Sequence, residues 1–110
     1  MKLLKIGRTY ANLEHLGTIS VRFDMDKQVM SLVAFFVQPV EENNNQIILH
    51  AENFDDNTYE DKLSVMDEIH ASIATGVLSN SSSVDCDELI GLVQKMRSTP
   101  SSDSEYTCLN

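Results

Sequence analysis

The segment FDDNTYED contains four carboxylates within seven positions: Asp55, Asp56, Glu60 and Asp61. Clusters of oxygen ligands are typical of Ca²⁺ and Mg²⁺ sites, and paired carboxylates also serve in acid–base catalysis. A calcium loop of the EF-hand type needs a glycine at its sixth position and a glutamate at its twelfth. Counted from Asp55, these positions hold Glu60 and Met66, so the segment does not fit that loop.

The start of a helix explains the same segment with fewer requirements. Asn57 or Thr58 would supply the N-cap, and Glu60 and Asp61 would occupy the first turn, where the helix dipole favours negative charge. A catalytic carboxyl group would need an apolar pocket that raises its pKa, whereas this run is mostly polar. We therefore predict neither a metal site nor a catalytic carboxylate here.

The remaining reactive side chains form no constellation of known chemistry. The histidines have neither HxxxH nor HxH spacing, and there is no glycine-rich phosphate loop or nucleophile turn. His50 lies in an apolar stretch and is interpreted as a partly buried structural histidine. Cys86 lies between Asp85 and Asp87, whose negative charge opposes a thiolate. The sequence thus predicts no catalytic activity and no cofactor.

Negative charge is concentrated in the middle of the chain. The net charge is −9, and residues 41–68 hold nine carboxylates against one cation, Lys62. An acidic surface repels phosphate backbones, which argues against direct nucleic-acid binding. It suits a basic protein partner, although solubility alone would also explain it. The predicted partner-binding face comprises Glu41, Glu42, Glu52, Asp55, Asp56, Glu60 and Asp61.

The N-terminal segment and the cysteines predict a compartment. Lys5 and Arg8 interrupt any apolar run near the start, so we expect no signal peptide, and no stretch approaches the roughly 20 apolar residues of a membrane span. Without a leader, Cys86 and Cys108 are expected to be free thiols in a reducing cytoplasm.

The periodicity predicts an α+β fold. Strands are expected over 2–10, 17–23, 29–37 and 46–53, followed by helices over 59–74, with Gly76 as the C-cap, and 85–97, opened by a capping box of Asp85 and Glu88. Short connections between the strands favour a four-stranded antiparallel sheet, with both C-terminal helices packed on one face. Residues 1–98 would form a single domain, and 99–110 a polar tail.

The segment 29–37 is apolar on both faces, which two helices on one side cannot cover. We therefore expect a second copy of the chain to cover the other face, although a strongly curled sheet or small barrel would also do so. The predicted dimer interface is Met30, Leu32, Ala34 and Phe36, or the alternate set Val29, Val33, Phe35 and Val37.

Two functions follow as hypotheses. The first is a small, acidic, non-catalytic interaction protein, an adaptor or an inhibitor of a basic, nucleic-acid-handling partner. In the inhibitor version, the face from Glu41 to Glu68 imitates the charge of phosphates. The second is a small-ligand-binding homodimer with its pocket at the subunit seam.

Overall fold

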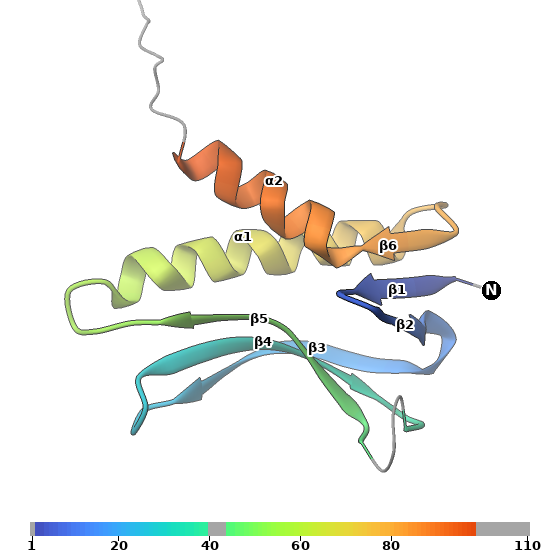
Figure 1. Cartoon of the computed structure of the whole chain (residues 1–110), viewed down its shortest axis with the longest axis horizontal. Coiled ribbons are helices and arrows are strands. Elements are labelled where there is room, and N and C mark those ends of the chain that lie inside the picture. The colour runs from blue at the N-terminus through green and yellow to red at the C-terminus, as the bar shows by residue number, and fades with distance from the viewer. Residues whose placement is uncertain (1, 40–43, 99–110) are drawn as a thin grey trace, which may run out of the picture.

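A computed structural model of the chain describes residues 2–39 and 44–98. The predicted α+β class is confirmed, and Figure 1 shows the arrangement of the elements. In chain order they are β1 (Leu3–Ile6), β2 (Thr9–Asn12), a short 3-10 helix (Leu13–His15), β3 (Leu16–Asp24), β4 (Val29–Phe36), β5 (Gln46–Asn53), α1 (Tyr59–Leu78), β6 (Ser83–Asp85) and α2 (Cys86–Ser98). Residues 99–110, predicted to be a tail, lie outside the described part.

The strands form two three-stranded sheets, which corrects the predicted single sheet of four strands. The expected first strand breaks at Gly7, whose φ of 57° is a left-handed conformation that glycine adopts without strain. The chain therefore turns back, so that β1 and β2 pair antiparallel. The short strand β6 then joins β1 in parallel and completes the order β2-β1-β6.

The second sheet is the antiparallel meander β3-β4-β5, as the short connections between its strands predicted. The turn between β3 and β4 is fixed by Asp24, whose Oδ1 accepts a hydrogen bond from the Lys27 amide at 3.1 Å. A register shift opposite Leu32 and Val33 places the extra residue Leu49 in β5. The shift turns both Leu49 and His50 away from solvent.

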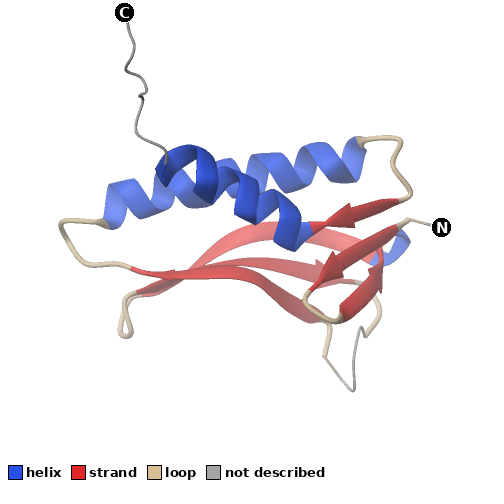
Figure 2. Ribbon diagram, turned by 45° about the horizontal axis from the view of Figure 1, so that its top comes forward, coloured by secondary structure: helices blue, strands red, loops and turns tan. Residues whose placement is uncertain are grey.

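Both helices lie on the same side of the β3-β4-β5 sheet (Figures 1 and 2), but α2 packs mainly against α1 and β1, so the predicted packing of both helices on one sheet face is confirmed only in part. The stripe of α1 that faces inward contains Met66, Ile69 and Ile73, each fully buried. The helix continues through Gly76, so the predicted C-cap there is wrong. A Cβ at Gly76 would lie 3.1 Å from Val84 Cγ1, and the glycine therefore lets β6 pack closely against α1.

The start of α2 has one of the two hydrogen bonds of the predicted capping box. The Asp85 Oδ1 accepts a hydrogen bond from the Glu88 amide at 3.2 Å. One residue into the helix, Asp87 accepts a hydrogen bond from the Gly7 amide at 2.7 Å. These contacts fix the N-terminal end of α2 against the β1–β2 turn.

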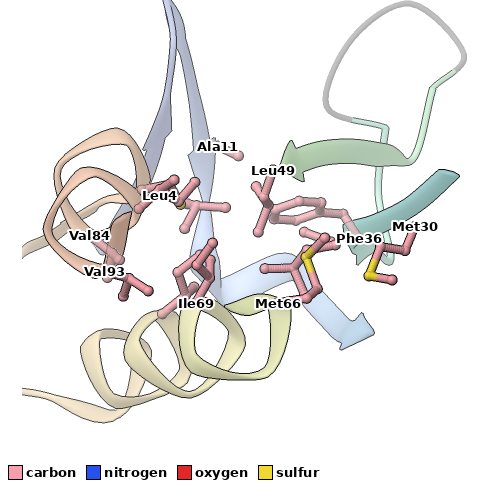
Figure 3. Close-up of a cluster of buried hydrophobic side chains, with 14 of the residues drawn as sticks. Leu4, Ala11, Met30, Phe36, Leu49, Met66, Ile69, Val84 and Val93 are labelled. Carbon is pink, nitrogen blue, oxygen red and sulfur yellow. The ribbon is translucent and has the colours of Figure 1, made fainter. Parts of the chain in front are cut away.

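The core lies between the helices and the two sheets (Figure 3), and it includes the four residues that were assigned to a dimer interface. Met30, Leu32, Ala34 and Phe36 face α1 and are at most 5% exposed, so they are core residues and are not available to a second copy. Strand residues alternate in direction, and Phe35 therefore points to the opposite side from Phe36. Phe35 is half-buried, because the Arg22 guanidinium lies 5.3 Å from its ring centroid.

Candidate functional site

The residues of the predicted partner-binding face do not act as one group. Asp55 is part of the turn that starts α1: its Oδ1 accepts hydrogen bonds from the amides of Asn57 and Thr58, both at 2.9 Å, and from Thr58 Oγ1 at 3.1 Å. The Asp55 amide in turn donates to Thr58 Oγ1 at 2.9 Å. The hydrogen bond from the Thr58 side chain and those from the two amides hold the pKa of Asp55 below its usual range.

This geometry supports the helix-start interpretation but corrects the residue that performs it. Thr58 occupies the N-cap position without a side-chain cap hydrogen bond, and the amides of Asn57 and Thr58 are satisfied by Asp55 instead. Within residues 2–39 and 44–98, no group of three potential metal ligands comes together.

Glu52 is turned toward the helices rather than to the outside. One carboxylate oxygen lies 2.6 Å from His50 Nε2 and the other accepts a hydrogen bond from Lys62 Nζ at 3.1 Å. Burial alone would raise the pKa of Glu52, but the hydrogen bonds from His50 and Lys62 outweigh it and the pKa falls below its ordinary value. Glu52 therefore links β5 to α1, and His50 has the structural place that its position in the strand predicted.

The solvent-exposed carboxylates that remain from the predicted face lie just before α1 and in its first turn. Asp56, Glu60 and Asp61 are exposed as predicted, and Asp67 and Glu68 extend the same side of the helix. We call these five residues the acidic α1 surface. Asp67 and Glu68 lie within the predicted stretch from Glu41 to Glu68 but were not named as partner-binding residues, although Glu60, Asp67 and Glu68 have the seven- and eight-residue spacing that places side chains on one helix face. Glu41 and Glu42 lie outside the described residues.

A shallow hollow of about 380 Å³ lies within the acidic α1 surface. Leu63 and Ala71 supply its apolar part, and Glu60, Asp67 and Glu68 its charged part. Charged and apolar side chains of a partner could therefore be accommodated together.

Arg97 from the end of α2 fixes one side of this hollow. Its Nε donates to Glu68 Oε1 at 2.8 Å, and its Nη2 donates to Ser64 Oγ at 2.7 Å. The hydrogen bond from Arg97 holds the pKa of Glu68 below its usual range. Glu68 is therefore ionised and held in place at neutral pH.

A second cleft of about 260 Å³ lies where β5, α1 and α2 meet. Three of its four charged residues are already engaged, because Glu52 binds Lys62 and Arg97 binds Glu68 outside the cleft; the fourth is Asp61. His50 does not line this cleft, so its imidazole is not placed to act on a molecule bound there.

The opposite side of the molecule is the open side of the β3-β4-β5 sheet. The register pairs one set of side chains on this side of the sheet, and we call this set the outer sheet face. It comprises the even positions 18–24 of β3, the odd positions 29–35 of β4, and positions 46, 48, 51 and 53 of β5. A hollow of about 250 Å³ lies on this face, bordered by Arg22, Val33, Phe35 and Ile48, among others.

Cys86 is the buried thiol at the first turn of α2. Burial raises the pKa of Cys86 to about 12, and the nearby carboxylates of Asp87 and Asp85 add to the shift. The thiol is therefore protonated at neutral pH and a poor nucleophile.

No protein-family model, no curated protein and no solved structure matches this chain. Among the described residues, neither helix is long and apolar enough to cross a membrane.

Proposed function

We propose that this protein is a small, non-catalytic interaction module whose acidic α1 surface binds a basic protein partner. The proposal rests on one observation: Glu60, Asp67 and Glu68 surround a hollow that Leu63 and Ala71 make partly apolar. Interfaces combine an apolar centre with a polar rim, and complementary charge sets the specificity and the rate of association. A basic segment with one or two apolar side chains has the matching chemistry.

The charge pattern favours a protein as the partner over nucleic acid. Glu68 is already paired with Arg97, and the other four carboxylates of the acidic α1 surface repel phosphates and attract Lys and Arg side chains. A protein that handles nucleic acid carries a basic surface made for phosphates. The acidic α1 surface would occupy such a basic surface in the manner of an inhibitor.

Two features support a role without catalysis. The thiol of Cys86 is buried and protonated, and the His50 imidazole is engaged with Glu52 away from the neighbouring cleft. The free thiol of Cys86 is also consistent with work in a reducing cytoplasm, which we propose as the compartment.

The test is capture from a native lysate with two variants of equal charge. The first variant carries Glu60→Gln, Asp61→Asn and Asp67→Asn on the acidic α1 surface. The control carries Glu14→Gln, Asp26→Asn and Glu88→Gln, three exposed carboxylates elsewhere. Each variant loses three negative charges, so the net charge changes from −9 to −6 in both.

We expect the wild type and the control to retain the same basic protein, and the α1 variant to lose it. Circular dichroism should show that both variants are folded, because all six positions are exposed. Equal loss by both variants would mean that net charge alone attracts the bound proteins, and full retention by both would mean that these carboxylates play no part; either result would refute the proposed surface.

A second candidate function is the binding of a small ligand on the outer sheet face. The observation in its favour is the hollow of about 250 Å³ that both Arg22 and Phe35 line, with the Arg22 guanidinium over the Phe35 ring. An aromatic ring and a guanidinium together suit a planar anionic molecule. Native mass spectrometry of the protein purified from its source would show an added mass that is lost on denaturation if such a ligand is bound.

A further inference from the structure

The outer sheet face differs from the rest of the chain in its charge. Although the net charge of the chain is −9, the twelve positions of this face carry one cation, Arg22, and one carboxylate, Asp24. The carboxylates of the acidic α1 surface lie on the helix layer, on the other side of the sheet (Figure 1). Two copies of this acidic chain therefore repel each other least when their outer sheet faces meet.

The same face exposes one large apolar side chain, Ile48, and part of a second, Phe35. Ile48 on β5 is 59% exposed, and it lies opposite Val33 of the central strand. Val33 itself is 6% exposed, and Phe35, the next outward residue of β4, is half-buried beside Arg22. The helices cannot cover these side chains, because both lie on the opposite side of the sheet (Figure 2).

We propose that the outer sheet face packs against the same face of a second copy in a two-fold symmetric dimer. In such a contact each copy presents the same surface, so Arg22 of one copy can meet Asp24 of the other, and the pairing occurs twice. The apolar centre formed by Phe35 and Ile48 meets its own copy, as in two sheets stacked about 10 Å apart. The neutral, self-complementary charge is what favours a second copy over a basic partner.

The small area of the face limits the affinity of the dimer. Three strands about 4.8 Å apart, with eight residues at about 3.3 Å each, cover roughly 14 Å by 26 Å. Two such faces give a projected area of roughly 700 Å², which is below the range of about 1,200–2,000 Å² that is typical of stable complexes. We therefore expect a reversible dimer with a Kd in the range of roughly 10 µM to 1 mM.

This inference is independent of the acidic α1 surface. A dimer through the outer sheet face leaves α1 on the outside of both copies, so each copy keeps its own partner-binding side (Figures 1 and 2). Loss of dimerisation would leave the lysate experiment unchanged, and loss of partner binding would leave the dimer unchanged.

The test is sedimentation equilibrium of the full chain from about 10 µM to about 1 mM, with two matched variants. Ile48→Glu adds a charge at the centre of the outer sheet face, where the side chain is 59% exposed. Leu92→Glu adds the same charge on α2, at a side chain that is 51% exposed. Because both positions are open to solvent, both variants are expected to fold, and thermal melting of each checks this.

We expect the mass of the wild type and of Leu92→Glu to rise from the chain mass of 12.3 kDa toward twice that value, whereas Ile48→Glu stays at the chain mass. A wild type that remains at the chain mass at 1 mM overturns the proposal. A dimer that survives in Ile48→Glu, or that is lost in Leu92→Glu alone, also overturns it by moving the contact elsewhere.

A fluorescence measurement gives an independent readout, because the chain contains no Trp. In Phe35→Trp the indole would be the only one in the protein and would lie on the outer sheet face. Its emission should shift to shorter wavelength as the concentration rises, and addition of Ile48→Glu should abolish the shift. An emission maximum that does not depend on concentration overturns the proposal.

Discussion

Lys62 Nζ on α1 lies 3.1 Å from Glu52 Oε1 on β5, and the second oxygen of the same carboxylate lies 2.6 Å from His50 Nε2. These contacts turn Glu52 inward and tie the first turns of the helix to the last residues of the sheet. The stability of this junction depends on Glu52 being ionised.

The lowered pKa of Glu52 predicts a loss of stability in acid. A carboxyl whose pKa is lower in the folded state stabilises the fold above its unfolded pKa, near 4.5, and this contribution disappears as the pH falls through the folded pKa. Urea unfolding between pH 6 and pH 2 should therefore show a smaller acid-induced loss in Glu52→Gln than in the wild type. The matched control is Glu60→Gln, an exposed carboxyl on α1, which should follow the wild type. Identical pH profiles for wild type and Glu52→Gln would mean that the pair contributes nothing.

Phe36 and Phe35 are neighbours in β4 that should differ in their cost on truncation. Phe36 is 5% exposed in the core, so Phe36→Ala should lower the free energy of unfolding by about 3–5 kcal/mol. Phe35 is half-buried on the outer sheet face, and Phe35→Ala should cost roughly 1–2 kcal/mol. Urea denaturation at low protein concentration measures both values. Equal costs would contradict the placement of the two rings on opposite faces.

Two helical glycines predict opposite effects of the same substitution. In Gly91→Ala the new Cβ meets no atom within 4 Å, so better helix propensity should stabilise the protein by about 0.5–1 kcal/mol. In Gly76→Ala the Cβ would lie 3.1 Å from Val84 Cγ1, and the buried Val84 has little room to move. We expect Gly76→Ala to lower the melting temperature. A higher melting temperature in both variants would show that β6 can move away from the added Cβ at little cost.

The turn at Asp55 predicts the response to divalent metals. Because Asp55 Oδ1 already accepts three hydrogen bonds, a metal ion would have to displace them. Titration with Ca²⁺, Mg²⁺ or Zn²⁺ should leave the melting temperature unchanged, whereas a site at 100 times its Kd would add about 2.7 kcal/mol. A stabilisation by calcium that Asp55→Asn abolishes would contradict the helix-start interpretation.

The short connections between strands predicted the β3-β4-β5 meander, and the helical spacing of apolar residues predicted the inward stripe of α1. The two apolar faces of β4 were also readable from the sequence. The sequence did not show which of the two faces the helices cover, because both faces of the strand are apolar. The assignment of Met30 and Phe36 to an interface was wrong for this reason. Their burial depends on the side from which α1 returns over the sheet.

The β2-β1-β6 sheet could not be predicted from the sequence for a different reason. Strand β6 is three residues long and follows a polar link, so it shows no periodicity of its own. Its pairing is decided by contacts far apart in the chain, such as Leu4 with Val84. Gly76 was misread for a related reason: glycine is common just after helix ends, but here the close approach of Val84 requires it inside α1.

The most direct test of the acidic α1 surface is the salt dependence of binding to the captured partner. Calorimetric titrations from about 50 to about 300 mM NaCl would compare the wild type with the two variants of equal net charge. We expect the affinity of the wild type and of the Glu14, Asp26 and Glu88 variant to fall steeply and in parallel with rising salt. The Glu60, Asp61 and Asp67 variant should bind more weakly at every concentration, with a clearly smaller dependence on salt. Parallel curves of equal affinity for all three proteins would contradict the account.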